Sequence, residues 1–302
     1  MRVSATVCSK GGVGKTTTTA NLGGLLADAG LRVLLIDLDS QPTLSSYYEL
    51  SQPAPGGVYE LLATELVDLD QIISHTAIPN LDIIVSNDYR NQLQQLLLNA
   101  PNGRFRLIDL LDRFADRYDA ILIDTQGARS VILEMAVMAA DRLISPIVPE
   151  LLTAREFVRG TQGMLNELRE LARYTRFEVP PVSILLNKMT DQLRDARDIA
   201  DSIRTMYAEV EDHGISVLET PLVNLSAYRS AALQGLPVHR VEPRKPYSRK
   251  APACADQLKA VAIDLYPEWA DAIRAVGAVG AVGAVTPNGK LGMGKSGVGH
   301  VH

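Results

Sequence analysis

Short apolar runs recur along the chain and alternate with longer segments of helical periodicity. Several runs are rich in β-branched residues and end at polar turn residues, which is typical of strands that are buried on both faces. The predicted strands cover residues 2–8, 32–37, 81–85, 120–124, 142–148 and 182–187. Because they alternate with helical segments, the sequence predicts an α/β fold with a mostly parallel, twisted sheet flanked by helices.

Three of the intervening segments carry specific helical signals. Residues 17–29 place their apolar residues on one helical face. A loop with Pro and Gly at 51–57 precedes a short amphipathic helix that starts at Gly57. A long surface helix is predicted from Glu150 to Ala172. Its spacing fits an ordinary packing helix as well as one that contacts a partner.

The end of the chain differs in composition. From Ala275 to Val285 the sequence repeats Ala-Val-Gly, and several glycines follow. Such a segment has no period that would bury one face, so it is typical of disorder. We therefore expect one domain over residues 1–272 and a low-complexity tail over 273–302. A Gly-Lys-Ser triplet at 294–296 has no strand before it, and we do not interpret it as a phosphate site.

Composition narrows the class of protein. At 302 residues and 46% hydrophobic content, the chain can bury one substantial core. No apolar run reaches the length of a membrane span, and the first residues enter a strand without a secretory signal, so a cytoplasmic protein is expected. Cys8 and Cys254 are the only cysteines. They provide neither a disulfide framework nor the paired thiols of an iron–sulfur cluster.

The residues after the first predicted strand carry the strongest chemical signal. Residues 9–17 read Ser-Lys-Gly-Gly-Val-Gly-Lys-Thr-Thr and lie between a strand and a helix, which is the context of a phosphate-binding loop. The glycines let backbone N–H groups turn toward phosphate oxygens, and the helix N-terminus adds a positive dipole. Lys15 then binds the β- and γ-phosphates, and the Thr16 hydroxyl binds Mg²⁺. The sequence therefore predicts a nucleotide-binding protein.

Two positions of this loop depart from the usual GxxxxGK[ST] form. Ser9 stands where the first glycine is usual, and a second lysine, Lys10, follows it. The string resembles the deviant Walker A motif of the ParA/MinD family of ATPases, and the resemblance extends over about residues 1–270. It implies that Lys10 crosses a dimer interface and contacts the phosphates of the partner subunit's ATP. ATP then holds two subunits together.

Three further strand ends match the family pattern in order. The resemblance implies that Asp39 positions the attacking water and that Asp37 lies near the metal. Asp124 ends a strand in the Walker B pattern, where it can hold Mg²⁺ through water. Asn187 is expected to read the adenine edge, and the segment after Pro221 to pack on the base. Each motif alone is also the pattern of a plain strand end, but together with the loop they indicate an ATPase.

The expected cofactors are ATP and Mg²⁺, and the loop chemistry and the resemblance together give the expected roles. The catalytic residues are Lys10, Lys15 and Asp39. The metal site uses Thr16, Asp37 and Asp124. The nucleotide contacts, with Thr17 at the α-phosphate, are Gly11, Gly12, Val13, Gly14, Lys15, Thr16, Thr17, Asn187 and Pro221.

The residues after Asp124 depart from the family. Many ParA-like proteins continue with Thr-Pro-Pro, but this chain has Thr125, Gln126 and Gly127. Gln126 can hydrogen-bond a water or a phosphate, which proline cannot do. A structural substitution that leaves the nucleotide chemistry unchanged is the interpretation we favour. The departure therefore bears more on the assignment to a subfamily than on the assignment of ATPase activity.

A net charge of −5 excludes a general polycation but allows a local basic face. A basic cluster late in the chain, interrupted by Glu242, is typical both of a solvated loop and of a surface that binds DNA phosphates. Members of the resembled family often carry DNA-contacting basic residues late in the chain, and this favours the interpretation as a DNA-binding surface. The candidates are Arg229, Arg240, Arg244, Lys245, Arg249 and Lys250.

The resemblance is closest to ParA-type partition ATPases. It implies a slow Mg²⁺-dependent ATPase, nucleoid-associated in the cytoplasm, that forms an ATP-dependent homodimer on non-specific DNA. A ParB-like centromere-binding protein stimulates it, and the cargo is a plasmid, chromosome or integrative element. A MinD-like ATPase instead binds membrane through a basic amphipathic helix. Residues 251–272 carry Asp264, Glu268 and Asp271, so no stable membrane association is expected. An accessory ATPase that positions conjugative-transfer or other non-DNA cargo uses the same switch and remains an alternative.

Overall fold

The computed structural model describes residues 1–64, 68–174, 177–190, 194–208 and 214–277. Of the predicted tail 273–302, the structure describes residues 273–277. The remaining residues, with the Gly-Lys-Ser triplet, lie outside the described ranges. The packed chain continues through Ala275, and Ile273 is fully buried. Within the described ranges, no helix combines the length and the apolar character needed to cross a membrane.

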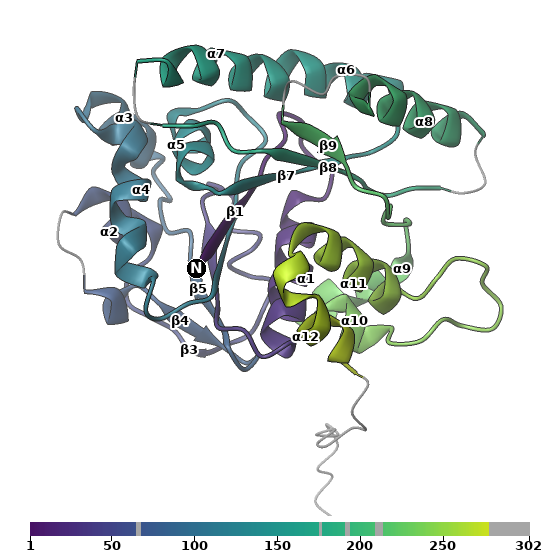
Figure 1. Ribbon diagram of the computed structural model, residues 1–302. Coiled ribbons are helices and arrows are strands. Elements are labelled where there is room, and N and C mark those ends of the chain that lie inside the picture. Colours follow the sequence, from purple (N-terminus) through teal and green to yellow (C-terminus); the bar gives the residue numbers. More distant parts are fainter. Residues whose placement is uncertain (65–67, 175–176, 191–193, 209–213, 278–302) are drawn as a thin grey trace, which may run out of the picture.

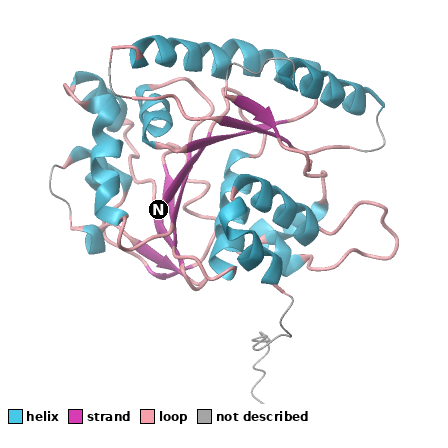
Figure 2. Ribbon diagram, in the orientation of Figure 1, coloured by secondary structure: helices cyan, strands magenta, loops and turns pink. Residues whose placement is uncertain are grey.

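One twisted sheet forms the centre of the molecule (Figures 1 and 2). Its strands run in the order β3-β4-β5-β2-β6-β1-β7-β8-β9, parallel from β5 to β9 and antiparallel at the β3-β4-β5 edge. The bounds are β1 Arg2–Thr6, β2 Val33–Asp37, β3 Leu50–Gln52, β4 Ser74–Thr76, β5 Leu81–Ile84, β6 Ala120–Asp124, β7 Arg142–Ile147, β8 Val182–Leu186 and β9 Ile215–Val217. The prediction of a mostly parallel α/β sheet is confirmed.

The six strands predicted from apolar runs correspond to β1, β2, β5, β6, β7 and β8. The other three, β3, β4 and β9, have three residues each and lie toward or at the sheet edges. The expected loop at 51–57 is wrong at its start, because Ser51 and Gln52 belong to β3. Such short segments have no apolar run long enough to mark them as strands.

Helices cover both faces of the sheet (Figure 1). Their bounds are α1 Lys15–Asp28, α2 Val58–Ala63, α3 Gln92–Asn99, α4 Arg106–Leu111, α5 Val131–Ala139, α6 Leu151–Glu156, α7 Gly163–Ala172, α8 Arg194–Ala208, α9 Ser226–Gln234, α10 Val238–Val241, α11 Cys254–Leu265 and α12 Ala270–Ala275. The π-helical segment η4, Phe157–Gln162, joins α6 to α7. The predicted helices at 17–29, after Gly57 and over 150–172 are confirmed.

Each central strand contributes to two hydrophobic clusters, one on each face of the sheet. In β2, Leu34 and Ile36 pack with residues of α2 to α5 and of α7, whereas Val33 and Leu35 pack against α1 and α11. This alternation follows the two-residue period of a strand. Because β2, β6 and β1 are parallel neighbours, their carboxyl ends lie at one edge of the sheet, where parallel sheets bind ligands.

An ion pair joins the end of α1 to α10. The Arg240 Nε donates to Asp28 Oδ2 at 2.7 Å, and Nε2 of the buried His239 lies 2.8 Å from the same oxygen. Burial opposes ionisation of Asp28, but the hydrogen bonds from Arg240 and His239 outweigh it and lower the pKa of Asp28 from 3.8 to about 2. The carboxylate therefore stabilises the fold while it is ionised.

We expect Asp28→Asn to lower the free energy of unfolding by about 2 kcal/mol at pH 7. Because the folded pKa lies below the unfolded one, this contribution is complete above about pH 4 and declines as the pH falls toward 2. Urea unfolding at pH 7 and pH 3 checks this, and the deficit of the variant should be roughly halved at pH 3. Asp271→Asn, in an exposed pair with Arg274, is the control. A deficit that grows on acidification contradicts the assignment.

Candidate nucleotide-binding site

The turn from β1 into α1 has the backbone of a phosphate-binding loop. Gly12 and Gly14 adopt left-handed conformations, with φ values of 76° and 96°. A Cβ on Gly14 would lie 2.3 Å from Asn187 Nδ2, so this position requires glycine for space as well as for conformation. Lys15 is the first residue of α1 and is 7% exposed. The loop therefore places a lysine and the positive end of a helix at one point.

Two adjoining cavities lie on this loop. The phosphate cavity, about 550 Å³, is lined by the three loop glycines, by residues 15–17 and by Asp39 and Gln126. The base cavity, about 470 Å³, extends along α1 toward α9. Both are lined by Gly14, Thr17 and Lys188, so they form one elongated depression. A phosphorylated ligand can place its phosphates in the first and an aromatic base in the second.

Thr16 and Asp124 contact each other beside the phosphate cavity. The Thr16 hydroxyl donates to Asp124 Oδ2 at 2.6 Å, while the buried Asp124 Oδ1 has no hydrogen-bond partner among the described residues. Burial raises the pKa of Asp124 to about 7, and the nearby Asp37 adds to the effect. A divalent cation would satisfy the unpaired oxygen and restore the charge, so this pair fits the Mg²⁺ site predicted from the sequence.

Asp37 is fully buried and already hydrogen-bonded. Its Oδ2 accepts from the backbone N–H and the hydroxyl of Ser45, each at 2.7 Å, and its Oδ1 accepts from the Asp39 N–H at 3.1 Å. Burial raises the pKa of Asp37 to about 6. In the described structure its oxygens hold the turn that carries Asp39.

Asp39 is fixed at the wall of the phosphate cavity. Its Oδ1 accepts from the Gln41 N–H at 3.0 Å, and its carbonyl accepts from the Ser86 hydroxyl at 2.6 Å. Ser86 in turn donates its N–H to the Ser45 hydroxyl at 2.8 Å. The two serines, which the sequence analysis missed, therefore support the position of Asp39. Isolated serines in loops give no signal that distinguishes them.

Lys10 does not line either cavity in the single chain. Its Nζ donates to the Thr153 hydroxyl at 2.9 Å and lies 3.9 Å from carboxylate oxygens of Glu150 and Glu156. Its side chain is 29% exposed. This second lysine of the loop is thus directed toward α6 and not into the cavity that Lys15 lines.

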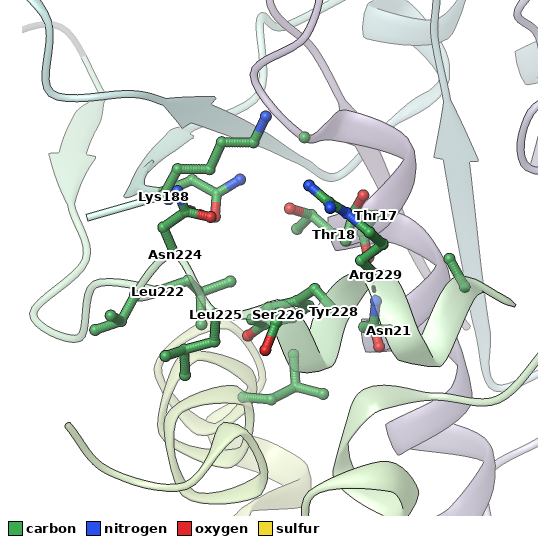
Figure 3. Close-up of a pocket in the computed structure, with 15 residues that line it drawn as sticks. Thr17, Thr18, Asn21, Lys188, Leu222, Asn224, Leu225, Ser226, Tyr228 and Arg229 are labelled. Carbon is green, nitrogen blue, oxygen red and sulfur yellow. Dashed lines mark hydrogen bonds between the residues drawn. The ribbon is translucent and has the colours of Figure 1, made fainter. Parts of the chain in front are cut away.

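Lys188 lies at one end of the base cavity (Figure 3). The preceding residue, Asn187, lines the same cavity. The Asn187 amide donates to the Val13 carbonyl at 2.7 Å, and Lys188 Nζ donates to the Gly12 carbonyl at 2.6 Å. Lys188 has a left-handed backbone, with φ 52°, which directs its side chain over the loop. No sequence motif marks Lys188 as part of the site. The structure makes it a wall of both cavities.

The far wall is the segment 222–226, which follows β9 in the chain. Its Val223 forms a parallel bridge with Met189, which lies just beyond the end of β8. This is the segment predicted to pack on the base. Pro221 is half-buried and lies just before the wall without lining the cavity. Of the predicted nucleotide-binding and catalytic residues, those that line the two cavities are the loop glycines, Lys15, Thr16, Thr17, Asp39 and Asn187. Val13, also predicted to contact the nucleotide, is buried and lines neither cavity.

Comparison with known proteins agrees with this geometry. Residues 1–179 match a family described as an AAA domain. The chromosome partitioning protein ParA of Myxococcus xanthus is 34% identical over 66% of this chain and 69% of its own. The sporulation initiation inhibitor protein Soj of Bacillus subtilis is 26% identical over 86% of this chain and 98% of its own.

Among solved structures, an ATP complex of a Cyanothece McdA variant superposes with a TM-score of 0.68 at 21% identity. The match covers 95% of this chain and 99% of McdA. At that identity the likeness shows the fold. The chain belongs to the ParA/MinD family of Walker A ATPases. As a member of this family, the chain has its phosphate loop between β1 and α1, at the edge where parallel sheets bind ligands.

Gln126 is where this ParA/MinD-family ATPase departs from the family pattern, and it contacts both the start of α5 and the phosphate cavity. Its side-chain amide donates to the Ser130 hydroxyl at 2.6 Å, and that hydroxyl caps α5 by accepting from the Leu133 N–H. Gln126 also lines the phosphate cavity. The hydrogen bond to a helix cap supports the structural interpretation of this residue.

Arg229 lies apart from the other predicted DNA-contacting residues. It projects from α9 beside Thr17 and Thr18 of α1 and lines the base cavity (Figure 3). No ion pair engages it within the part of the chain that the structure describes. A guanidinium there can contact a phosphate or ribose oxygen of a bound nucleotide.

The remaining basic residues lie on α10 and in the loop 242–253 that follows it. Two of them are engaged within the chain: Arg240 binds Asp28, and the Arg249 Nη1 donates to Glu242 Oε2 at 2.8 Å. The residues Arg244, Lys245 and Lys250 are exposed and make no ion pair among the described residues. The basic surface at this loop therefore has three unpaired cations per chain.

Proposed function

We propose that this chain is a ParA-like ATPase that partitions or positions a cargo through an ATP-driven cycle. The observation that carries the proposal is the convergence of Lys15, Thr16, Asp39 and Asp124 at one edge of the sheet, around a cavity that fits a triphosphate. The name of the Myxococcus relative supports partitioning, and the ATP in the McdA complex supports the nucleotide. ATP and Mg²⁺ are the cofactors.

The proposed division of roles follows from the contacts. Lys15 binds the β- and γ-phosphates. Thr16 and Asp124 would hold Mg²⁺, and the ion would neutralise charge on the phosphate oxygens. Asp39 accepts a hydrogen bond from the attacking water and directs it at the γ-phosphate. Asn187 and Arg229 contact the nucleoside end. Water is the nucleophile, and the products are ADP and phosphate.

Dimerisation is the second part of the proposal. We infer that Lys10 exchanges its contacts with α6 for the γ-phosphate of a partner subunit, because a triphosphate is a stronger anionic partner than a hydroxyl and two carboxylates at 3.9 Å. Two ATP-loaded chains then face each other, each supplying one lysine to the other site. Nucleotide hydrolysis removes that contact and separates the dimer.

Lys10→Ala should therefore separate binding from turnover. We expect the monomer to keep its ATP affinity within about threefold, because Lys10 does not line the cavity, while turnover falls about a thousandfold. Titration of a fluorescent ATP analogue and steady-state phosphate release check the two quantities. The control is Lys259→Ala on α11. Equal losses of affinity and turnover would place Lys10 in its own subunit's site.

DNA binding is the third part. An ATP-held dimer brings two copies of the loop 242–253 into one assembly and so doubles the unpaired cations. Such a surface binds phosphates without reading bases. Binding of this kind gives the chain a nucleoid-associated distribution. A ParB-like protein that stimulates hydrolysis would then release the dimer from DNA and so move the cargo.

A DNA titration with and without ATP, at several salt concentrations, tests this function. Six cations per dimer predict that log K falls with log salt with a slope of about −5. Combined Lys245→Glu and Lys250→Glu should lower DNA affinity at least about tenfold while leaving nucleotide affinity unchanged. Arg173→Glu, far from this loop in sequence, is the control. If the DNA affinity is the same with and without ATP, the result contradicts the proposal and favours a non-DNA cargo.

A further inference from the structure

A separate apolar groove of about 360 Å³ lies between η4 and α8. Its floor is closely packed. The rings of Phe157 and Tyr207 meet edge to face with centroids 6.0 Å apart, and the Tyr207 hydroxyl donates to Gln162 at 3.2 Å. Figure 1 shows the two helical segments side by side at the top of the molecule. The groove is therefore a fixed depression and not a gap between loose helices.

The rim of this groove combines exposed apolar side chains with positive charge. Val158 is 42% exposed and Met206 is 51% exposed, although both are large apolar residues. Arg155 and Arg159 also line the groove, are exposed, and make no ion pair within the described ranges, and no carboxylate lines it. An apolar depression beside two unpaired guanidiniums complements a segment that carries both apolar and acidic side chains.

The other side of η4 contacts the entrance of the phosphate loop. Ser9 donates its N–H to the Thr161 hydroxyl at 3.1 Å and its own hydroxyl to the Glu156 carbonyl at 3.1 Å. A Cβ on Gly160 would lie 2.2 Å from the Ser9 hydroxyl, so the two segments are in close contact. Lys10, the next residue, is bound to Thr153 of α6. A π-helical segment is a frequent feature of functional sites, and here it joins the groove to the loop.

We propose that the groove docks a helical segment of a partner protein with apolar residues on one face and carboxylates beside them, and that docking displaces η4 and raises ATP turnover by loosening Lys10 from α6. The docking follows the helix-in-groove mode of recognition. Its effect on turnover rests on the proposed ATPase function, whereas docking itself does not. Acidic groups of the partner pair with Arg155 and Arg159, and its apolar residues cover Val158 and Met206.

A synthetic peptide tests the docking without nucleotide. The probe has roughly four helical turns, with leucines on one face and glutamates along both edges of that face, and its counterpart has lysines in place of the glutamates. Fluorescence anisotropy should show that the glutamate peptide binds at least about tenfold more tightly than the lysine peptide. Met206→Glu, and separately the pair Arg155→Glu and Arg159→Glu, should each weaken it at least about tenfold.

Because these side chains are exposed, the variants should keep the fold, which their unfolding temperatures verify. Arg173→Glu, in an exposed pair at the end of α7, is the matched control and should leave the affinity unchanged. The docking proposal is overturned if both peptides bind equally well. It is also overturned if the groove variants bind the glutamate peptide as tightly as the wild type does. Binding of vesicles of anionic phospholipid that the same variants abolish overturns it as well, and so does a nucleotide-free dimer of the chain that Met206→Glu dissociates.

Thr161→Val tests the path to the loop, since it removes the acceptor of the Ser9 N–H and keeps the side-chain shape. The variant should bind the glutamate peptide with unchanged affinity, but the peptide should no longer raise its ATP turnover. Persistent stimulation in this variant overturns the coupling and leaves the docking intact. A chain that binds the peptide but hydrolyses no ATP under any condition contradicts the proposed function and not the docking.

Discussion

Replacing Lys15 with alanine should reduce ATP affinity at least about a hundredfold. Lys15 is 7% exposed, at the first position of α1, where its ammonium faces the phosphate cavity. Two charge-assisted hydrogen bonds to phosphate, each contributing about 1.5–3 kcal/mol, correspond to this loss or a larger one. Lys15 also opposes the burial effect on the pKa of Asp124, so its removal favours the protonated carboxyl and weakens the metal site.

Calorimetric titration with ATP and Mg²⁺ checks this prediction. The control is Lys10→Ala, which removes the other lysine of the same loop and is expected to keep the affinity. An affinity of Lys15→Ala within about tenfold of the wild type would show that the phosphates bind elsewhere. The contrast between the two lysines separates binding within a subunit from a contribution across the dimer.

Replacing Asp39 with alanine should lower turnover about a thousandfold and retain ATP binding, which leaves a long-lived ATP-bound dimer. The expected loss is that of a group that orients or deprotonates the attacking water. The carboxylate lines the cavity, and the Ser86–Ser45 hydrogen bonds hold its backbone in place. Its position does not depend on the nucleotide, so the variant should still assemble the site.

Asp39→Asn distinguishes charge from position, because its amide oxygen can still accept from the Gln41 N–H. Rapid mixing with radiolabelled ATP should show the same deficit for both variants in the chemical step. If Asp39→Asn turns over at the wild-type rate, the residue shapes the turn and does not act on water. Normal turnover of Asp39→Ala removes it from the mechanism altogether.

The sequence predicts the sheet and the loop well because both have local signals. Short runs rich in apolar and β-branched residues identify the central strands. In the loop, Gly12 and Gly14 occupy left-handed backbone positions that favour glycine. The short strands β3, β4 and β9, at or next to the sheet edges, have three residues each and are paired with neighbouring strands. No local pattern encodes such pairing.

Charge clusters are less predictable, because the partner of a charged residue can be far away in the sequence. Arg240 reads as a member of a basic run, but it binds Asp28, which lies 212 residues earlier. Glu242 reads as an interruption of the run, but it binds Arg249. The sequence therefore overestimates the free positive charge of this loop. Lys188 was missed for a similar reason, since only the fold brings it onto the phosphate loop.

The central claim is that ATP joins two copies of the chain, with Lys10 of each acting on the other's nucleotide. Multi-angle light scattering on a column equilibrated with a non-hydrolysable ATP analogue and Mg²⁺ measures this directly. The account predicts a species of twice the 32.8 kDa chain mass for the wild type and for Asp39→Ala, and a species of the single-chain mass for Lys10→Ala. A wild-type protein that stays at the single-chain mass while saturated with nucleotide would contradict the account.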